Sequence, residues 1–96
     1  MEQKIKTLIG LRGYILSFRR GGGGDYPKQV LIKFPNINNY KEAARLLGRK
    51  VVWRNNKGNE IRGVIRRLHG KKGVVVAYFR KPLPGQALGT EVFIVG

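Results

Sequence analysis

The sequence contains no cysteine, so it cannot form disulfide bonds or bind a metal through thiolates. Its single histidine argues against a conventional zinc site and against catalysis by two histidines. No stretch approaches the roughly 18 apolar residues of a membrane span, and residues 1–11 lack the uninterrupted apolar stretch of a signal peptide. We therefore expect a cytoplasmic protein with no metal, cofactor, membrane partner or small-molecule substrate.

Acidic residues are scarce, because five Asp and Glu stand against 20 Lys and Arg, which gives a formal net charge of +15. Such an excess does not indicate the fold, but it predicts a polyanionic partner, since a free domain of this charge repels itself. Hydrophobic residues make up 42% of the chain, enough for one modest core, and 96 residues are too few for two. We expect one RNA-binding domain, residues 1–96.

Alternation of apolar and polar residues predicts a series of short strands. The predicted extended segments are residues 4–20, 28–34, 50–54, 61–68, 74–79 and 92–95. The first changes its apolar face near Gly13, which indicates a bulge or a sharp bend there. Turns are expected at residues 55–59, 69–73 and 81–85, where asparagine, glycine or proline cluster. Six or seven short strands predict a mainly β fold, a small closed or nearly closed barrel, with one short helix.

The predicted helix follows Asn39, which forms with Glu42 a pair typical of a capping box. Gly48 lies where a helix C-terminus favours glycine. A helix of about two turns depends on packing against the rest of the fold. Its apolar side is expected to comprise Tyr40, Ala43, Ala44 and Leu47.

Basic residues cluster beside predicted strand ends and loops, where side chains can reach phosphates without disturbing a core. Half of the 20 cations are arginine, whose planar guanidinium can bind a phosphate through two hydrogen bonds and stack on bases. A solvated charged surface without a partner is the alternative. The predicted RNA-binding residues are Arg19, Arg20, Arg49, Lys50, Arg66, Arg67, His69, Lys71, Lys72, Arg80 and Lys81.

Other features admit two interpretations. Residues 21–24 are all glycine, but the lysine and hydroxyl of a nucleotide-binding P-loop are missing, so a flexible loop that settles into an RNA groove fits better. His69 has no titratable partner at a telling spacing, and contact with backbone or phosphate fits better than general base catalysis. Four aromatic residues can stack on bases, although aromatics in strands more often pack in a core. These are Tyr14, Trp53, Tyr78 and Phe79.

The second half of the chain resembles the thirty-five-Ae family of large-subunit ribosomal proteins of archaea and eukaryotes. The resemblance begins with LGRK at residues 47–50 and continues with GVIRRLHG at 63–70 and GVVVAYFR at 73–80. It ends with LPGQALG at 83–89. The order of these motifs, rather than any one of them, carries the resemblance.

The resemblance implies a small β-barrel of the kind shared with a domain of translation factors, and a structural role on large-subunit RNA without catalysis. By position it implies that His69, Gly70 and Gly73 shape a basic hairpin. It also implies RNA contacts by Arg80 and by Arg67 or Arg66. The residues implied to fix the connection into the last strand are Leu83, Pro84, Ala87 and Gly89.

We therefore expect a structural constituent of the large ribosomal subunit that binds ribosomal RNA through basic loops. Its expected partners are this RNA and neighbouring ribosomal proteins, with transfer RNA as a further candidate. The nearest alternative is a barrel subunit of another ribonucleoprotein, such as an RNA-modifying particle. A small ribonuclease that uses His69 and a cationic membrane-active protein are the others, and no long amphipathic helix with a basic face supports the last.

Overall fold

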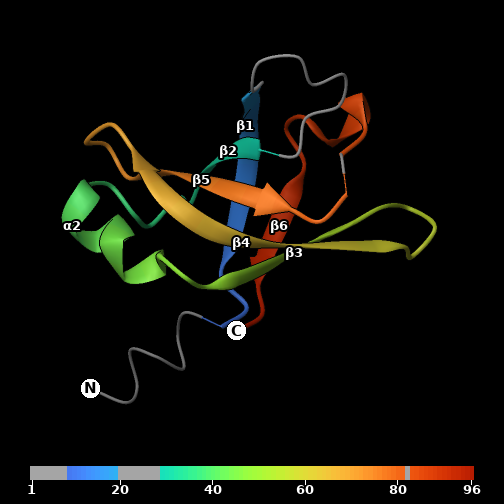
Figure 1. Cartoon of the computed structure of the whole chain (residues 1–96), viewed down its shortest axis with the longest axis horizontal. Helices are drawn as coiled ribbons and strands as arrows, with labels where there is room; N and C mark the ends of the chain where they lie inside the picture. The colour runs from blue at the N-terminus through green and yellow to red at the C-terminus, as the bar shows by residue number, and fades with distance from the viewer. Residues whose placement is uncertain (1–8, 20–28, 82) are drawn as a thin grey trace.

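Six antiparallel strands close into a barrel in the order β1-β2-β5-β4-β3-β6 (Figure 1). The structure is a computed structural model that describes residues 9–19, 29–81 and 83–96. Its strands are β1 (Arg12–Arg19), β2 (Gln29–Lys33), β3 (Lys50–Arg54), β4 (Glu60–His69), β5 (Val74–Phe79) and β6 (Glu91–Ile94). The prediction of a mainly β, closed barrel with a short helix is confirmed. Residues 4–8, Arg20, the four glycines, Lys28 and Pro82 lie outside the described residues.

One hydrophobic core fills the barrel. Alternate residues of β2 point inward, and Phe34 continues this row just beyond the strand; Val30, Ile32 and Phe34 are all fully buried. The neighbouring strand β5 contributes Val75 and Ala77 to the same cluster. No polar or charged side chain is buried among the residues whose burial is described. The cations whose burial is described are therefore all on the outside of the barrel, where a partner can reach them.

Two bulges interrupt the regular pairing, one in β1 between Ile15 and Ser17 and one in β4 between Ile65 and Arg67. A bulge or sharp bend was expected near Gly13, and the bulge of β1 lies slightly beyond that residue, between Ile15 and Ser17. Gly13 is required for a different reason, since a Cβ atom there would lie only 2.7 Å from the Ile32 side chain. β1 thus approaches the core side chains of β2 too closely for any larger residue.

Helix α2 (Tyr40–Ala43) tightens directly into the 3-10 turn η1 (Ala44–Leu46). Asn39 caps it as predicted, because its side-chain oxygen accepts a hydrogen bond from the Glu42 backbone N–H at 2.9 Å. The predicted apolar side is partly wrong: Ala43 and Leu46 are buried, whereas Tyr40, Ala44 and Leu47 are exposed. A 3-10 turn repeats every three residues rather than 3.6, which carries Leu46 instead of Leu47 onto the core side.

The helix lies against one end of the barrel and the β3–β4 turn projects at the other (Figure 1). The Tyr40 backbone N–H donates to the Lys71 carbonyl at 3.0 Å, which joins α2 to the turn between β4 and β5. A second 3-10 turn, η2 (Gly85–Ala87), precedes β6 in the connection from β5. In the described ranges no helix is long and apolar enough to cross a membrane.

Candidate nucleic-acid interface

The bulge in β4 turns two successive arginines outward. A regular strand would place Arg66 and Arg67 on opposite faces of the sheet. In β4, however, Ile65 pairs with Ala77 and Arg67 with Val76, so Arg66 is the extra residue and both arginines are exposed. A bulge of this kind redirects side chains without removing a strand from the sheet. Both arginines lie within the strand predicted for residues 61–68, near its end at the β4–β5 turn.

Four cations surround a shallow hollow on the outer surface of β3, β4 and β5. The hollow measures about 340 Å³, and its lining includes Lys50, Arg62, Arg66, Arg80, Val64 and Tyr78. We call the surface formed by these six residues the basic face. Lys50 and Tyr78 pair with Val64 from either side, and the Arg80 backbone N–H donates to the Arg62 carbonyl at 2.9 Å. The sheet register thus holds four cations around one half-buried tyrosine.

The positive charge of the basic face is not neutralised within the described part of the chain. No carboxylate lines the hollow. Glu91 accepts from Arg12 at 3.1 Å and Glu60 accepts from Arg54 at 2.6 Å, which are the two ion pairs of the described ranges. The carboxylate of Glu42, at the helix, accepts from the Asn39 amide. Each of the three described acidic side chains is therefore hydrogen-bonded to another group; Glu60 shares a smaller hollow with Arg62 and Arg80 but is paired with Arg54. The four cations of the basic face repel one another until an anion arrives.

A second basic group lies at the β4–β5 turn. We call Arg67, His69, Lys71 and Lys72 the hairpin cluster; all four side chains are exposed. His69 is the last residue of β4 rather than part of the turn.

The glycines shape this hairpin as predicted. Gly70 and Gly73 have φ of +74° and +95°, conformations that favour glycine. The Lys33 ammonium also holds the hairpin, because it donates to the carbonyls of Ile37 and Lys72.

The structure separates the predicted RNA-binding residues into these two groups and a few single positions. Lys50, Arg66 and Arg80 meet on the basic face. Arg49 is half-buried, and its carbonyl accepts from the Ile65 N–H at 2.9 Å, beside the β4 bulge. Arg19 ends β1, opposite Gln29 of β2. Lys81 lines other hollows, beyond the end of β5.

Sequence analysis missed Arg62, which lies centrally on the basic face. It stands alone between Ile61 and Gly63, so the search for basic pairs passed over it. Arg62 lies four residues before Arg66 in the same predicted strand. Because residues an even number apart lie on one face of a strand, this spacing could have placed Arg62 beside Arg66.

The aromatic residues divide between the core and the surface. Trp53 and Phe79 are buried, as expected for strand aromatics that pack in a core. Tyr14 is exposed and Tyr78 is half-buried on the basic face, so these two rings lie on the outside of the barrel.

The comparison with known families decides what kind of protein carries this surface. The family model described as ribosomal protein L35Ae matches residues 9–95, which is nearly the whole chain. The chain belongs to this family. The resemblance recognised in the second half is therefore confirmed, and the match to the L35Ae model also includes β1 and β2.

Relatives of this chain include curated proteins named large ribosomal subunit protein eL33. That of Methanopyrus kandleri is 43% identical over 82 residues, which cover 84% of this chain and 91% of the relative. That of Aeropyrum pernix is 39% identical over 85 residues, covering 88% and 89%. A eukaryotic relative, from Dictyostelium discoideum, is 32% identical over 93 residues, covering 88% and 89%.

Membership of the L35Ae family makes this chain a structural protein of the ribosome rather than an enzyme, and it places the chain on ribosomes in the cytoplasm. The family therefore supports the ribosomal interpretation over a ribonuclease that uses His69. No group of three potential metal ligands occurs within residues 9–19, 29–81 and 83–96. The individual RNA contacts of the L35Ae protein stay predictions.

Proposed function

We propose that this L35Ae protein is a structural constituent of the large ribosomal subunit, built as one RNA-binding domain, whose basic face binds the ribosomal RNA backbone. The observation that carries the proposal is the convergence of Lys50, Arg62, Arg66 and Arg80 on a hollow without a carboxylate. RNA phosphates replace the repulsion between these cations with attraction, and binding releases counterions into solution. The hairpin cluster supplies a second set of phosphate contacts around the β4–β5 turn.

The rigidity of the barrel contributes to this binding. Three of the four cations stand on the paired strands β3 and β4, and Arg80, just beyond β5, is joined to Arg62 by a backbone hydrogen bond. Their backbone positions are therefore set before RNA arrives, and little ordering of the chain is needed. Arginines of the basic face can grip phosphates through two hydrogen bonds, and the half-buried Tyr78 ring offers an apolar surface between them. Ribosomal RNA and neighbouring ribosomal proteins are the proposed partners, and transfer RNA remains a candidate.

Salt-dependent binding to large-subunit ribosomal RNA tests this proposal. Replacing Arg62, Arg66 and Arg80 by alanine removes three contacts. If each meets one phosphate, the slope of log K against log salt should become shallower by about 2 to 3. The matched control replaces Arg12, Lys41 and Arg45 by alanine, which lowers the net charge equally but leaves the basic face and the Arg54–Glu60 pair intact.

The control should lose much less affinity than the variant of the basic face, and both should melt near the wild-type temperature. Equal losses in the two triple variants would show that only net charge matters, and the basic face would then not be the binding site.

A further inference from the structure

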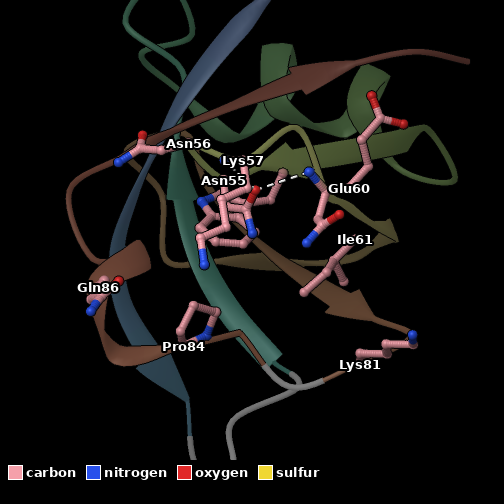
Figure 2. A pocket seen from close by; sticks show the side chains of 10 residues that line it. Asn55, Asn56, Lys57, Glu60, Ile61, Lys81, Pro84 and Gln86 are labelled. Atoms are coloured by element: carbon pink, nitrogen blue, oxygen red, sulfur yellow. Dashed lines mark hydrogen bonds between the residues drawn. The ribbon is translucent and has the colours of Figure 1, made fainter.

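A second hollow, of about 810 Å³, lies beside the basic face and is rich in side-chain amides. It separates the β3–β4 turn from the segment that leads into η2 (Figure 2). Its lining includes Asn55, Asn56, Asn59 and Gln86, together with Trp53 and Pro84. We call it the amide hollow. Figure 2 shows Asn55 at its centre, with Pro84 and Gln86 on one side and Ile61 and Lys81 on the other.

The first wall of the amide hollow is held by its own hydrogen bonds. The Asn55 side-chain oxygen accepts from the backbone N–H groups of Lys57 and Asn59, each at 2.9 Å. The Gly58 N–H donates to the Asn55 carbonyl at 3.1 Å. Asn55 is thus a structural residue of the turn, whereas the side chains of Asn56 and Asn59 are exposed and available to a ligand.

The second wall is tied to the first through the indole of Trp53. The Trp53 Nε1–H donates to the Thr90 hydroxyl oxygen at 2.8 Å, and the Thr90 hydroxyl donates to the Ala87 carbonyl of η2. The Ala87 N–H in turn donates to the Pro84 carbonyl at 2.9 Å. Because both walls are held before binding, a ligand need not order them, which favours affinity and selectivity.

The chemistry of the lining matches an unpaired nucleobase. A side-chain amide both donates and accepts, and asparagine or glutamine can form two hydrogen bonds with N6 and N7 of adenine. Ile61 and Pro84 supply apolar surface for the faces of a base, whereas the buried Trp53 adds only a small exposed edge. Proteins read RNA sequence mainly through such splayed-out, unpaired bases, because the major groove of an RNA duplex is too narrow for side chains.

The positive charge of the amide hollow also favours RNA binding. The β3–β4 turn contributes Lys57 and the opposite segment contributes Lys81, so each wall carries one cation for a flanking phosphate. The lining holds one carboxylate, that of Glu60, and it is paired with Arg54 at 2.6 Å.

A smaller hollow of about 240 Å³ connects this region to the basic face. Its lining combines Arg62 and Arg80 of the basic face with Glu60, Ile61 and Lys81 of the amide hollow. A strand of RNA whose backbone lies on the basic face can therefore place an adjoining nucleotide in the amide hollow. We propose that the amide hollow binds one unpaired adenine of the ribosomal RNA; this inference rests on the proposed function, because the basic face holds the neighbouring backbone.

Fluorescence anisotropy with three eight-nucleotide RNAs, oligo(A), oligo(C) and oligo(U), tests the inference. These probes have the same backbone charge, so a difference between them reports contacts with the bases. Wild-type protein should bind oligo(A) about tenfold or more tightly than the other two, as expected for two hydrogen bonds to one base edge. Replacing both Asn59 and Gln86 by alanine should remove the preference while the affinity for oligo(C) stays within about twofold.

The matched control is the double variant Asn36→Ala, Asn38→Ala, which removes two exposed asparagines outside the amide hollow and should keep the preference. If the wild type bound the three RNAs equally, the inference would be overturned. That result is expected if the amide hollow receives a protein segment instead of a base. A preference that persists after Asn59 and Gln86 are replaced would also overturn the inference. The proposed function is tested separately, because the double variant Arg62→Ala, Arg80→Ala should weaken all three RNAs by a similar factor.

Discussion

Replacement of Gly63 by alanine should destabilise the barrel where the core and the basic face meet. Gly63 is buried in β4, between Arg62 and Val64. A Cβ atom there would lie 2.7 Å from the Tyr78 carbonyl oxygen and 2.9 Å from the Phe79 ring. The carbonyl belongs to the backbone of β5 and cannot rotate away, so relief requires β4 to move away from β5.

The size of the effect follows from the cost of overpacking. Inserting a methyl group into a packed core costs about 1–3 kcal/mol, and each kcal/mol lowers the melting temperature of a domain this small by roughly 4–8 °C. Gly63→Ala should therefore melt between about 4 and 24 °C below the wild type. Because the same movement separates Arg62 from Arg80, affinity for large-subunit RNA should also fall at a temperature where the variant is folded.

Thermal unfolding followed by circular dichroism measures the first effect. Gly85→Ala is the matched control, because a Cβ atom at Gly85 would have no neighbour within 4 Å and its φ is not positive. Its melting temperature should stay at or slightly above that of the wild type, since alanine restricts the unfolded chain. If Gly63→Ala melted within about 2 °C of the wild type, β4 and β5 could separate at no cost, and the argument from close approach would be refuted.

Three further substitutions test hydrogen bonds that hold helix α2, the amide hollow and the β4–β5 hairpin. Asn39→Ala removes the helix cap and should lower the free energy of unfolding by about 1 kcal/mol in urea titrations; Asn38→Ala, one residue earlier, should not, and equal effects would contradict the capping role. Thr90→Val leaves the Trp53 indole N–H without its acceptor and should cost about 1–3 kcal/mol, whereas Thr90→Ser should be close to wild type; a silent Thr90→Val would mean that this bond is not needed. Lys33→Met removes the ammonium that holds the carbonyls of Ile37 and Lys72, so amide hydrogen exchange at residues 70–73 should accelerate; unchanged exchange there would show that the turn is held by its glycines alone.

Local patterns were enough to locate most of the elements. The β-branched run of residues 74–79 and the run 50–54 became strands at the predicted bounds. Asn39 and Gly48 marked the ends of the helical segment, because capping depends on residues adjacent in the chain. Predictions failed where two distant segments decide the outcome. The alternation within β1 or β4 alone could not locate a bulge, since a bulge is a mismatch in residue number between two paired strands.

The candidate sites show the same division. Arg66, Arg80 and Lys50 were recognised as basic residues, but their meeting around Tyr78 depends on the register of three strands. The amide hollow combines residues 53–61 with residues 81–86, which approach each other only in the closed barrel.

The sequence by itself determined the excess of positive charge, the alternation of the strands and the motifs of a ribosomal protein family, since composition and neighbouring residues suffice for each. Only the tertiary structure decided which cations share a face, which aromatic ring accompanies them and where the amides gather. The physical reason is that barrel closure and strand register set distances between residues far apart in the chain, and binding depends on those distances.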